Sequence, residues 1–162
     1  MVNSVPQSVL ETLIPFYTLT GCDSTSFIAQ HSKKTGWDTL VHHSHLIQNL
    51  GNHTLEQPDY KMIEKFLCAL YAMAEEDNIN NVSFKLFLKK KNPNALPPTK
   101  DALSHHIDRS HLQSSIWIMA YIPKPILPEA TECGYEMTDI GLKPILMTKA
   151  SNIRICIKDY IL

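Results

Sequence analysis

The sequence lacks the features that mark several large classes of protein. Its 162 residues contain only four cysteines, with no CxxC pair, so neither a zinc module nor a disulfide framework is indicated. The N-terminus shows no basic stretch followed by an apolar one, which speaks against a signal peptide. The longest apolar run, residues 116–122, is too short to cross a bilayer. We therefore expect a soluble, intracellular protein that has no membrane partner.

The chain also has a net charge close to zero and lacks several common catalytic motifs. The formal net charge is −1, so any contact with nucleic acid must rest on a local basic patch. A P-loop, a GxSxG motif and a dinucleotide fingerprint are all missing. Hydrophobic residues make up 44% of the chain and charged residues 19%, values typical of a globular protein. The lysines gather in two groups, Lys33 with Lys34, and Lys85 with Lys89, Lys90 and Lys91.

Hydrophobic periodicity predicts a mainly α fold. Pro15 is expected to kink the first helix, and Gly51 to end the second. Pro58 suits the first turn of the third helix, and Thr99 is a good N-cap for the last. Residues 82–91 alternate partly like a strand, but we favour a helix that three lysines end. The expected helices cover residues 10–19, 34–50, 59–77, 82–91 and 99–121.

The expected architecture is a multi-helix, bundle-like domain with a helix–turn–helix-like N-terminal element. Prolines at 123–128 exclude a further helix, and the tail should be irregular with a short strand within residues 142–147. The predicted segments are residues 1–52, 53–122 and 123–162. The predicted core includes Leu13, Trp37, Phe66, Leu70, Ile107 and Trp117.

Residues 21–37 are the most informative part of the sequence. An apolar segment runs into a Gly-Cys-Asp turn, and nine residues separate Asp23 from the Lys33–Lys34 pair, which opens the next predicted helix. A carboxylate on a turn can hold a divalent cation, and a basic helix start can meet a phosphodiester. Asp23 can equally well cap the turn, and the lysines can be solvated surface residues. Both interpretations remain open at this point.

This segment resembles the Gly-x-Asp-x6-Gly-x-Gly-x-Lys-x-Ala motif of flap-endonuclease/XPG-type PIN nucleases. It is still more similar to the Leu-Thr-Gly-Cys-Asp-Thr motif of invertebrate mobile-element-like proteins that carry this region. The match covers Gly21, Asp23 and Lys34 without a gap. Gln30 and Ser32 replace two glycines that would let backbone amides approach a DNA phosphate.

The resemblance implies a C-terminal PIN region, on the helix–three-turn–helix side, that is truncated or degenerate. It implies Asp23 as a ligand of Mg2+ or Mn2+, and Lys33 and Lys34 as contacts for DNA. Only one other acid, Glu11, precedes Asp23, so we expect no cleavage of DNA or RNA by this chain alone. The expected location is intracellular, with the nucleus as one candidate. The alternatives are a helical protein-interaction module, or a divalent-metal nuclease completed by a partner chain.

Two further groups of polar residues are expected to be exposed at the surface. Asp38, His42 and His45 share one face of the second helix, where a solvated surface is favoured over a zinc site. Gly36 stands where the family has alanine and should cost the helix about 1 kcal/mol. The last predicted helix should expose a second polar group, made up of His105, His106, Asp108, Arg109 and His111.

Overall fold

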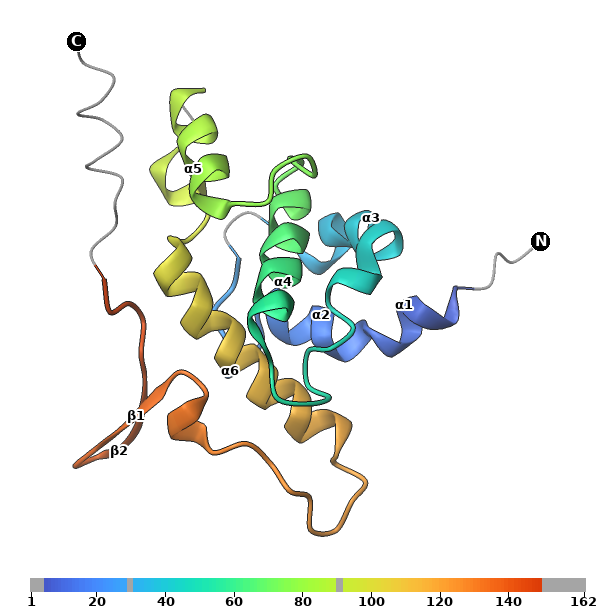
Figure 1. Cartoon of the computed structure of the whole chain (residues 1–162), viewed down its shortest axis with the longest axis vertical. Coiled ribbons are helices and arrows are strands. Elements are labelled where there is room, and N and C mark those ends of the chain that lie inside the picture. Colours follow the sequence, from blue (N-terminus) through green and yellow to red (C-terminus); the bar gives the residue numbers. More distant parts are fainter. Residues whose placement is uncertain (1–4, 29–30, 90–91, 150–162) are drawn as a thin grey trace.

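The computed structural model describes residues 5–28, 31–89 and 92–149 (Figure 1). The mainly helical fold class is confirmed: these residues form six α-helices and one two-stranded antiparallel sheet near the C-terminal end. Some residues used in the sequence analysis lie outside the described residues, namely Gln30, Lys90, Lys91 and the tail beyond residue 149. The helices are α1 (Gln7–Glu11), α2 (Leu13–Leu19), α3 (Lys33–His43), α4 (Gln57–Leu70), α5 (Ile79–Leu88) and α6 (Lys100–Ile118). Short 3-10 turns are η1 (Ser44–Leu46), η2 (Pro93–Ala95) and η3 (Ala130–Glu132), and the strands are β1 (Tyr135–Thr138) and β2 (Gly141–Pro144).

The first predicted helix is interrupted, but the break precedes Pro15. Helix α1 ends at Glu11, and α2 begins after Thr12, so Pro15 lies in the first turn of α2. Proline has no N–H group, and its ring clashes with the carbonyl four residues earlier in a continuous helix. That carbonyl belongs to Glu11, which explains why α1 stops there. The helix is therefore interrupted because of Pro15, as predicted, and the interruption lies one turn before the proline.

Helices α3 and α4 are both shorter than their apolar patterns suggest. The predicted helix 34–50 ends at His43, and the chain continues through η1 into turns that close at Gly51, where φ is +92°. Helix α4 ends at Leu70 rather than at residue 77, because Ala72 takes a left-handed φ of +58°. In both cases the apolar residues beyond the helix enter the core from a turn.

The helix starts follow local capping chemistry. The Ser32 hydroxyl accepts a hydrogen bond from the Thr35 N–H at the start of α3, and the Thr99 hydroxyl accepts one from Ala102 at the start of α6. Residues 82–88 are helical, as favoured, but the helix starts earlier: α5 begins at Ile79, with Asn78 as its N-cap. The Thr99 cap and the helix over residues 82–88 are thus confirmed.

Helix α4 lies at the centre and contacts α3, α5 and α6, while α2 packs along α6 (Figure 1). Phe66, Leu70 and Ile107 are buried as predicted. Leu13 and Trp37 are each 37% exposed, so their assignment to the core is wrong. The remaining buried apolar residues of the cluster include Val9, Phe16, Leu19, Leu40, Ile47, Leu50, Ile63, Leu67, Ile79, Val82 and Leu103.

The packing of α3 explains why Trp37 faces outward. Gly36 and Leu40 are both buried and lie four residues apart, so they define the inner face of α3. Trp37 is rotated from Gly36 by about 100° around the helix axis and falls on the outer side. A Cβ atom on Gly36 would lie 2.9 Å from Phe16 Cζ and 3.1 Å from Leu70 Cδ1. Gly36 therefore permits close packing of α3, which a local helix propensity does not reveal.

The strands form a hairpin beside α6 (Figure 1). The buried Arg109 side chain of α6 donates hydrogen bonds to the carbonyl oxygens of Gly134 and Ile145, one on each side of the hairpin. Asp101, nearer the start of α6, accepts hydrogen bonds from the backbone of Thr148 and Lys149. The hairpin and the residues that follow it, up to Lys149, are thus held by polar groups of α6. None of the helices within the described residues is long and apolar enough to cross a membrane.

Candidate nucleic-acid interface

The turn that follows α2 is fixed by Thr25. The Cys22 N–H donates to both the carbonyl and the hydroxyl oxygen of Thr25, each at 3.1 Å. The Thr25 hydroxyl in turn donates to the Thr18 carbonyl at 2.7 Å. Gly21 has a φ of +108°, and Thr25 is buried. The turn is therefore stabilised by Thr25, and not by the Asp23 cap that the sequence offered as an alternative.

Asp23 is exposed on this turn. In the part of the chain that the structure describes, its carboxylate takes part in no hydrogen bond or ion pair. No group of three or more His, Cys, Asp or Glu side chains among those residues could hold a metal ion. Glu11 is on α1, where it accepts a hydrogen bond from Gln7. Asp23 thus offers a metal a single exposed carboxylate.

Lys33 lies across the turn and fastens it to α3. Its ammonium group donates to the Gly21 carbonyl at 2.6 Å and to the Thr20 hydroxyl at 3.2 Å. The same Nζ atom lies 4.1 Å from the centre of the Tyr17 ring. Partial burial lowers the pKa of Lys33 from its usual value, an effect that the nearby Cys22 opposes. Lys33 therefore supplies a positive charge and also connects the turn after α2 to the start of α3.

Lys34 differs from Lys33 because its side chain is exposed. It belongs to the first turn of α3, where backbone N–H groups and the helix dipole favour an anion. Within the described residues, neither Lys33 nor Lys34 forms an ion pair with a carboxylate. The start of α3 consequently carries positive charge that no acidic group of the described residues neutralises.

Two aromatic rings lie near the Lys33 ammonium group, and a third lies beside one of them. Phe27 is 76% exposed and Tyr17 is 47% exposed, and the Lys33 Nζ lies 5.9 Å from the Phe27 ring centre. Trp117, at the end of α6, has its ring centre 5.8 Å from that of Tyr17. Trp117 is only partly buried, so its assignment to the core is wrong. We call Tyr17, Phe27, Lys33 and Trp117 the aromatic–lysine cluster.

Sequence reasoning missed this cluster. Tyr17 and Trp117 both fit apolar helical stripes, which favours a core position over a surface one. One signal was available: Phe27 follows the polar stretch Asp-Ser-Thr-Ser and belongs to no apolar stripe. A large apolar side chain in such a place has no helix face to join.

Cys22 lies beneath the turn and is buried. Its sulfur is 3.1 Å from the Thr25 hydroxyl oxygen and 3.4 Å from that of Ser24. Burial alone would raise the pKa of Cys22, but hydrogen bonds from Ser24 and Thr25 outweigh it and lower that pKa. The thiol is therefore part of the hydrogen-bonded framework of the turn.

The two groups of histidines differ in their exposure to solvent. Asp38, His42 and His45 are exposed, as expected for a surface face of α3 and η1. The prediction that the polar group of α6 is exposed is wrong for His106, His111 and Arg109, which are buried. Each of them has a backbone partner that makes burial tolerable.

The backbone partners fix the roles of both α6 histidines. His106 donates from Nε2 to the Leu19 carbonyl at 2.7 Å, and His111 Nδ1 accepts from the Gly51 N–H at 2.9 Å. Burial lowers the pKa of both from the usual 6.5. At His106 the hydrogen bond to Leu19 opposes the shift, and Arg109 adds to it. At His111, His53 also lowers the pKa, and Asp59 opposes the shift. Both side chains are held neutral by the fold.

This burial predicts acid-sensitive stability. A histidine with a lowered pKa in the folded state contributes stability that is fully present above pH 6.5 and is lost as pH falls below it. We expect the free energy of unfolding to drop between pH 7 and pH 5, by up to about 1.4 kcal/mol per pH unit for each such histidine. Urea titrations across this range measure the slope. A slope that is unchanged in the double variant His106→Gln/His111→Gln would contradict the assignment.

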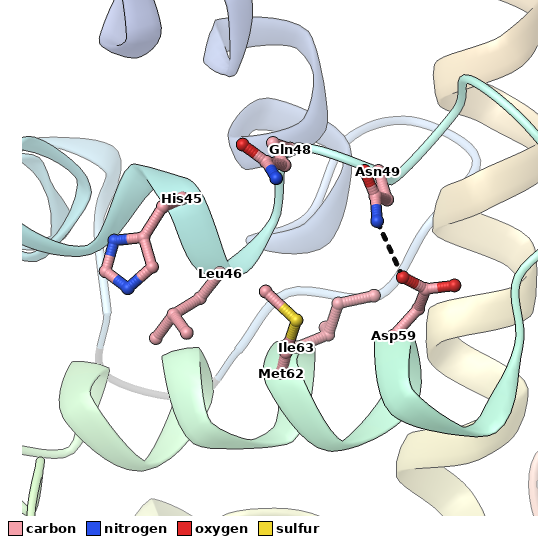
Figure 2. A pocket seen from close by; sticks show the side chains of 7 residues that line it. All are labelled: His45, Leu46, Gln48, Asn49, Asp59, Met62 and Ile63. Carbon is pink, nitrogen blue, oxygen red and sulfur yellow. Dashed lines mark hydrogen bonds between the residues drawn. The ribbon is translucent and has the colours of Figure 1, made fainter.

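A depression between η1 and α4 is lined by seven residues, but it does not form a binding site (Figure 2). Its interior has no room for a water-sized molecule. The Asn49 amide donates to Asp59 Oδ1 at 2.7 Å, and the Glu56 N–H donates to Asp59 Oδ2 at 2.9 Å. Asp59 is therefore occupied in joining the turn before α4 to the loop after η1.

Comparison with known proteins adds no assignment to this geometry. No protein-family model, no curated protein and no solved structure matches the chain.

Proposed function

We propose that this chain is a helical nucleic-acid-binding module that performs no catalysis by itself. Its contact surface is the start of α3, with Lys34 at the phosphate and Lys33 holding the turn beside it. Descent from a PIN/flap-endonuclease-like region of a mobile-element protein is part of the proposal, and rests on Gly21, Asp23 and Lys34. DNA is the expected ligand. The expected location is intracellular, with the nucleus as the place where the chain would bind DNA.

One observation supports this proposal more strongly than it supports the alternative functions. Positive charge at the start of α3 has no carboxylate partner within the described residues, and the dipole of an eleven-residue helix adds to it. Phosphate is the ligand that such an arrangement favours. The net charge of the whole chain is −1, so the attraction is local and should be weak.

The non-catalytic part of the proposal follows from the carboxylates. Cleavage with two metal ions needs several convergent acidic ligands, whereas Asp23 offers one exposed carboxylate. We propose that Mg2+ or Mn2+ binds weakly at Asp23 and exchanges freely with solvent. Metal-dependent cleavage that survives purification and is lost in Asp23→Asn would favour the alternative, a nuclease whose site is completed by a partner chain.

A protein-interaction module is the second candidate. It is favoured by large apolar side chains that are exposed on α1, α2 and α3, namely Leu10, Leu13, Trp37 and Val41. Salt separates the two functions, because phosphate contacts release counterions and apolar contacts do not. Binding that is insensitive to salt would favour the protein-interaction function.

Lys34→Ala tests the proposed contact. We expect affinity for a short DNA duplex or single strand to fall about two- to fivefold, the range of an exposed ionic contact. The slope of log K against log salt should flatten by about one ion. Fluorescence anisotropy at several salt concentrations measures both quantities.

Lys61→Ala is the matched control for this test, because Lys61 is an exposed lysine on α4. It removes the same charge from the chain at a position away from the start of α3. Equal effects of the two substitutions would show that only net charge matters, and would contradict a contact at Lys34.

A further inference from the structure

We propose that the aromatic–lysine cluster binds an unpaired nucleobase, so that the preferred ligand is single-stranded nucleic acid. This inference rests on the proposed function and names the substrate class of the same surface. It is carried by the juxtaposition of three partly or largely exposed rings with one ammonium group that has no carboxylate partner among the described residues.

The rings come from three separate parts of the chain. Tyr17 belongs to α2, Phe27 to the loop before α3, and Trp117 to the end of α6. The Tyr17 and Trp117 ring planes are inclined by 49°, with centres 5.8 Å apart. Lys33 Nζ lies over the Tyr17 ring at 4.1 Å and near the Phe27 ring at 5.9 Å. Folding has thus placed Tyr17 and Phe27 beside the partly buried Lys33 ammonium group, with Trp117 next to Tyr17.

The position of Phe27 is fixed before any ligand arrives. Thr25 and Ile28, on either side of it, are both buried, and Ile28 N–H donates to the Thr20 carbonyl at 3.5 Å. A Cβ atom on Gly21 would lie only 2.6 Å from Phe27 Cα, so the two backbones are in close contact. The Phe27 backbone is held in place while its side chain is 76% exposed, so the loop loses little entropy when a base stacks on the ring.

The chemistry of the cluster selects the ligand. A planar, apolar face matches a base. The Lys33 ammonium group, which has no carboxylate partner among the described residues, adds positive charge that favours the neighbouring phosphates of the strand. In a duplex the base faces are covered by their neighbours, so stacking on Phe27 requires an unpaired base. A peptide with an acidic side chain could meet the cation, but it would not need an aromatic face.

Phe27 variants test this inference directly. The probe is a fluorescein-labelled twelve-residue oligothymidylate, compared with the same strand fully paired to its complementary oligoadenylate, and anisotropy gives both affinities. We expect the wild type to prefer the single strand, and Phe27→Ala to lose about tenfold in affinity for it. Phe27→Leu should lose a similar amount, because leucine keeps apolar area but has no ring face. Phe27→Trp should bind at least as well as the wild type.

Phe87→Ala is the matched control, since Phe87 is an exposed phenylalanine on α5 and should leave affinity unchanged. Quenching of Trp117 fluorescence by oligothymidylate, measured in a Trp37→Phe background, should report contact at the cluster itself. Wild-type affinity in Phe27→Leu, or equal affinity for strand and duplex, would overturn the inference while the proposed function stands. Absence of salt-dependent binding to either probe would overturn the proposed function, and this inference with it.

Discussion

Gly51→Ala should reduce the free energy of unfolding by about 3 kcal/mol, through backbone strain and overpacking together. Gly51 has a φ of +92°, a conformation in which an alanine is strained. Its Cβ atom would also lie 2.5 Å from Ser114 Cβ and 3.0 Å from the Ser114 carbonyl carbon on α6. The clash involves the backbone of a central helix, so a side-chain rotation cannot relieve it.

Gly51 is also held by hydrogen bonds on both sides of its Cα. Its N–H donates to His111 Nδ1 at 2.9 Å, and its carbonyl accepts from the Ser115 hydroxyl at 3.1 Å. Moving the turn away from α6 would break both bonds and leave buried polar groups unpaired. The fold therefore has no inexpensive way to accommodate the added methyl group.

Gly141→Ala separates strain from packing. Gly141 has a φ of +117°, but a Cβ atom there would meet nothing within 4 Å. Only backbone strain remains, and the expected loss is about 1 kcal/mol, most of it confined to the hairpin. Urea unfolding followed by circular dichroism compares the two variants. Equal losses would show that the close approach of Gly51 to α6 does not contribute to stability.

The helical elements were predictable because their signals are local. The apolar stripe of α4, its Pro58 start and the Thr99 cap of α6 are all properties of a few neighbouring residues. The ends of α3 and α4 were not predictable in this way. Apolar residues continue past both helices and enter the core from turns, so periodicity alone cannot show where a helix stops.

The buried polar face of α6 was predicted to be exposed, for a related reason. Hydrophobicity says nothing about which backbone carbonyl will lie opposite a histidine or an arginine. The Thr18 and Ser114 hydroxyls are hydrogen-bonded at 2.6 Å between α2 and α6, and His106 bonds to the Leu19 carbonyl. These helices meet along short polar side chains, an interface that an apolar pattern does not mark.

The candidate site was only partly accessible from the sequence. The motif brought Gly21, Asp23 and the two lysines to attention. The structure joins Lys33 to the turn that carries Gly21 and Asp23, and Lys34 follows it in the first turn of α3. The motif could not show that Lys33 bonds to the Gly21 carbonyl, or that Trp117 of α6 lies beside Tyr17 of α2. Contacts between distant segments depend on packing, which residue spacing does not encode.

Gly21→Ala should disturb both the fold and the proposed binding surface. Gly21 has a φ of +108°, and a Cβ atom there would lie 2.6 Å from Phe27 Cα and 2.9 Å from Phe27 N. We expect a loss of about 2–3 kcal/mol in the free energy of unfolding, because the close contact is with backbone. The loop must shift, and the Lys33 bond to the Gly21 carbonyl must shift with it.

The second consequence concerns ligand binding. At a temperature where the Gly21→Ala variant remains folded, its affinity for oligothymidylate should fall at least as far as that of Phe27→Ala, about tenfold, because Phe27 and Lys33 are displaced together. Ser26→Ala is the control, since Ser26 is an exposed residue of the same loop. Circular dichroism checks that the helices persist, and anisotropy measures affinity. The substitution moves the backbone of Phe27. A folded Gly21→Ala protein with wild-type affinity would therefore show that the geometry of the aromatic–lysine cluster does not determine binding.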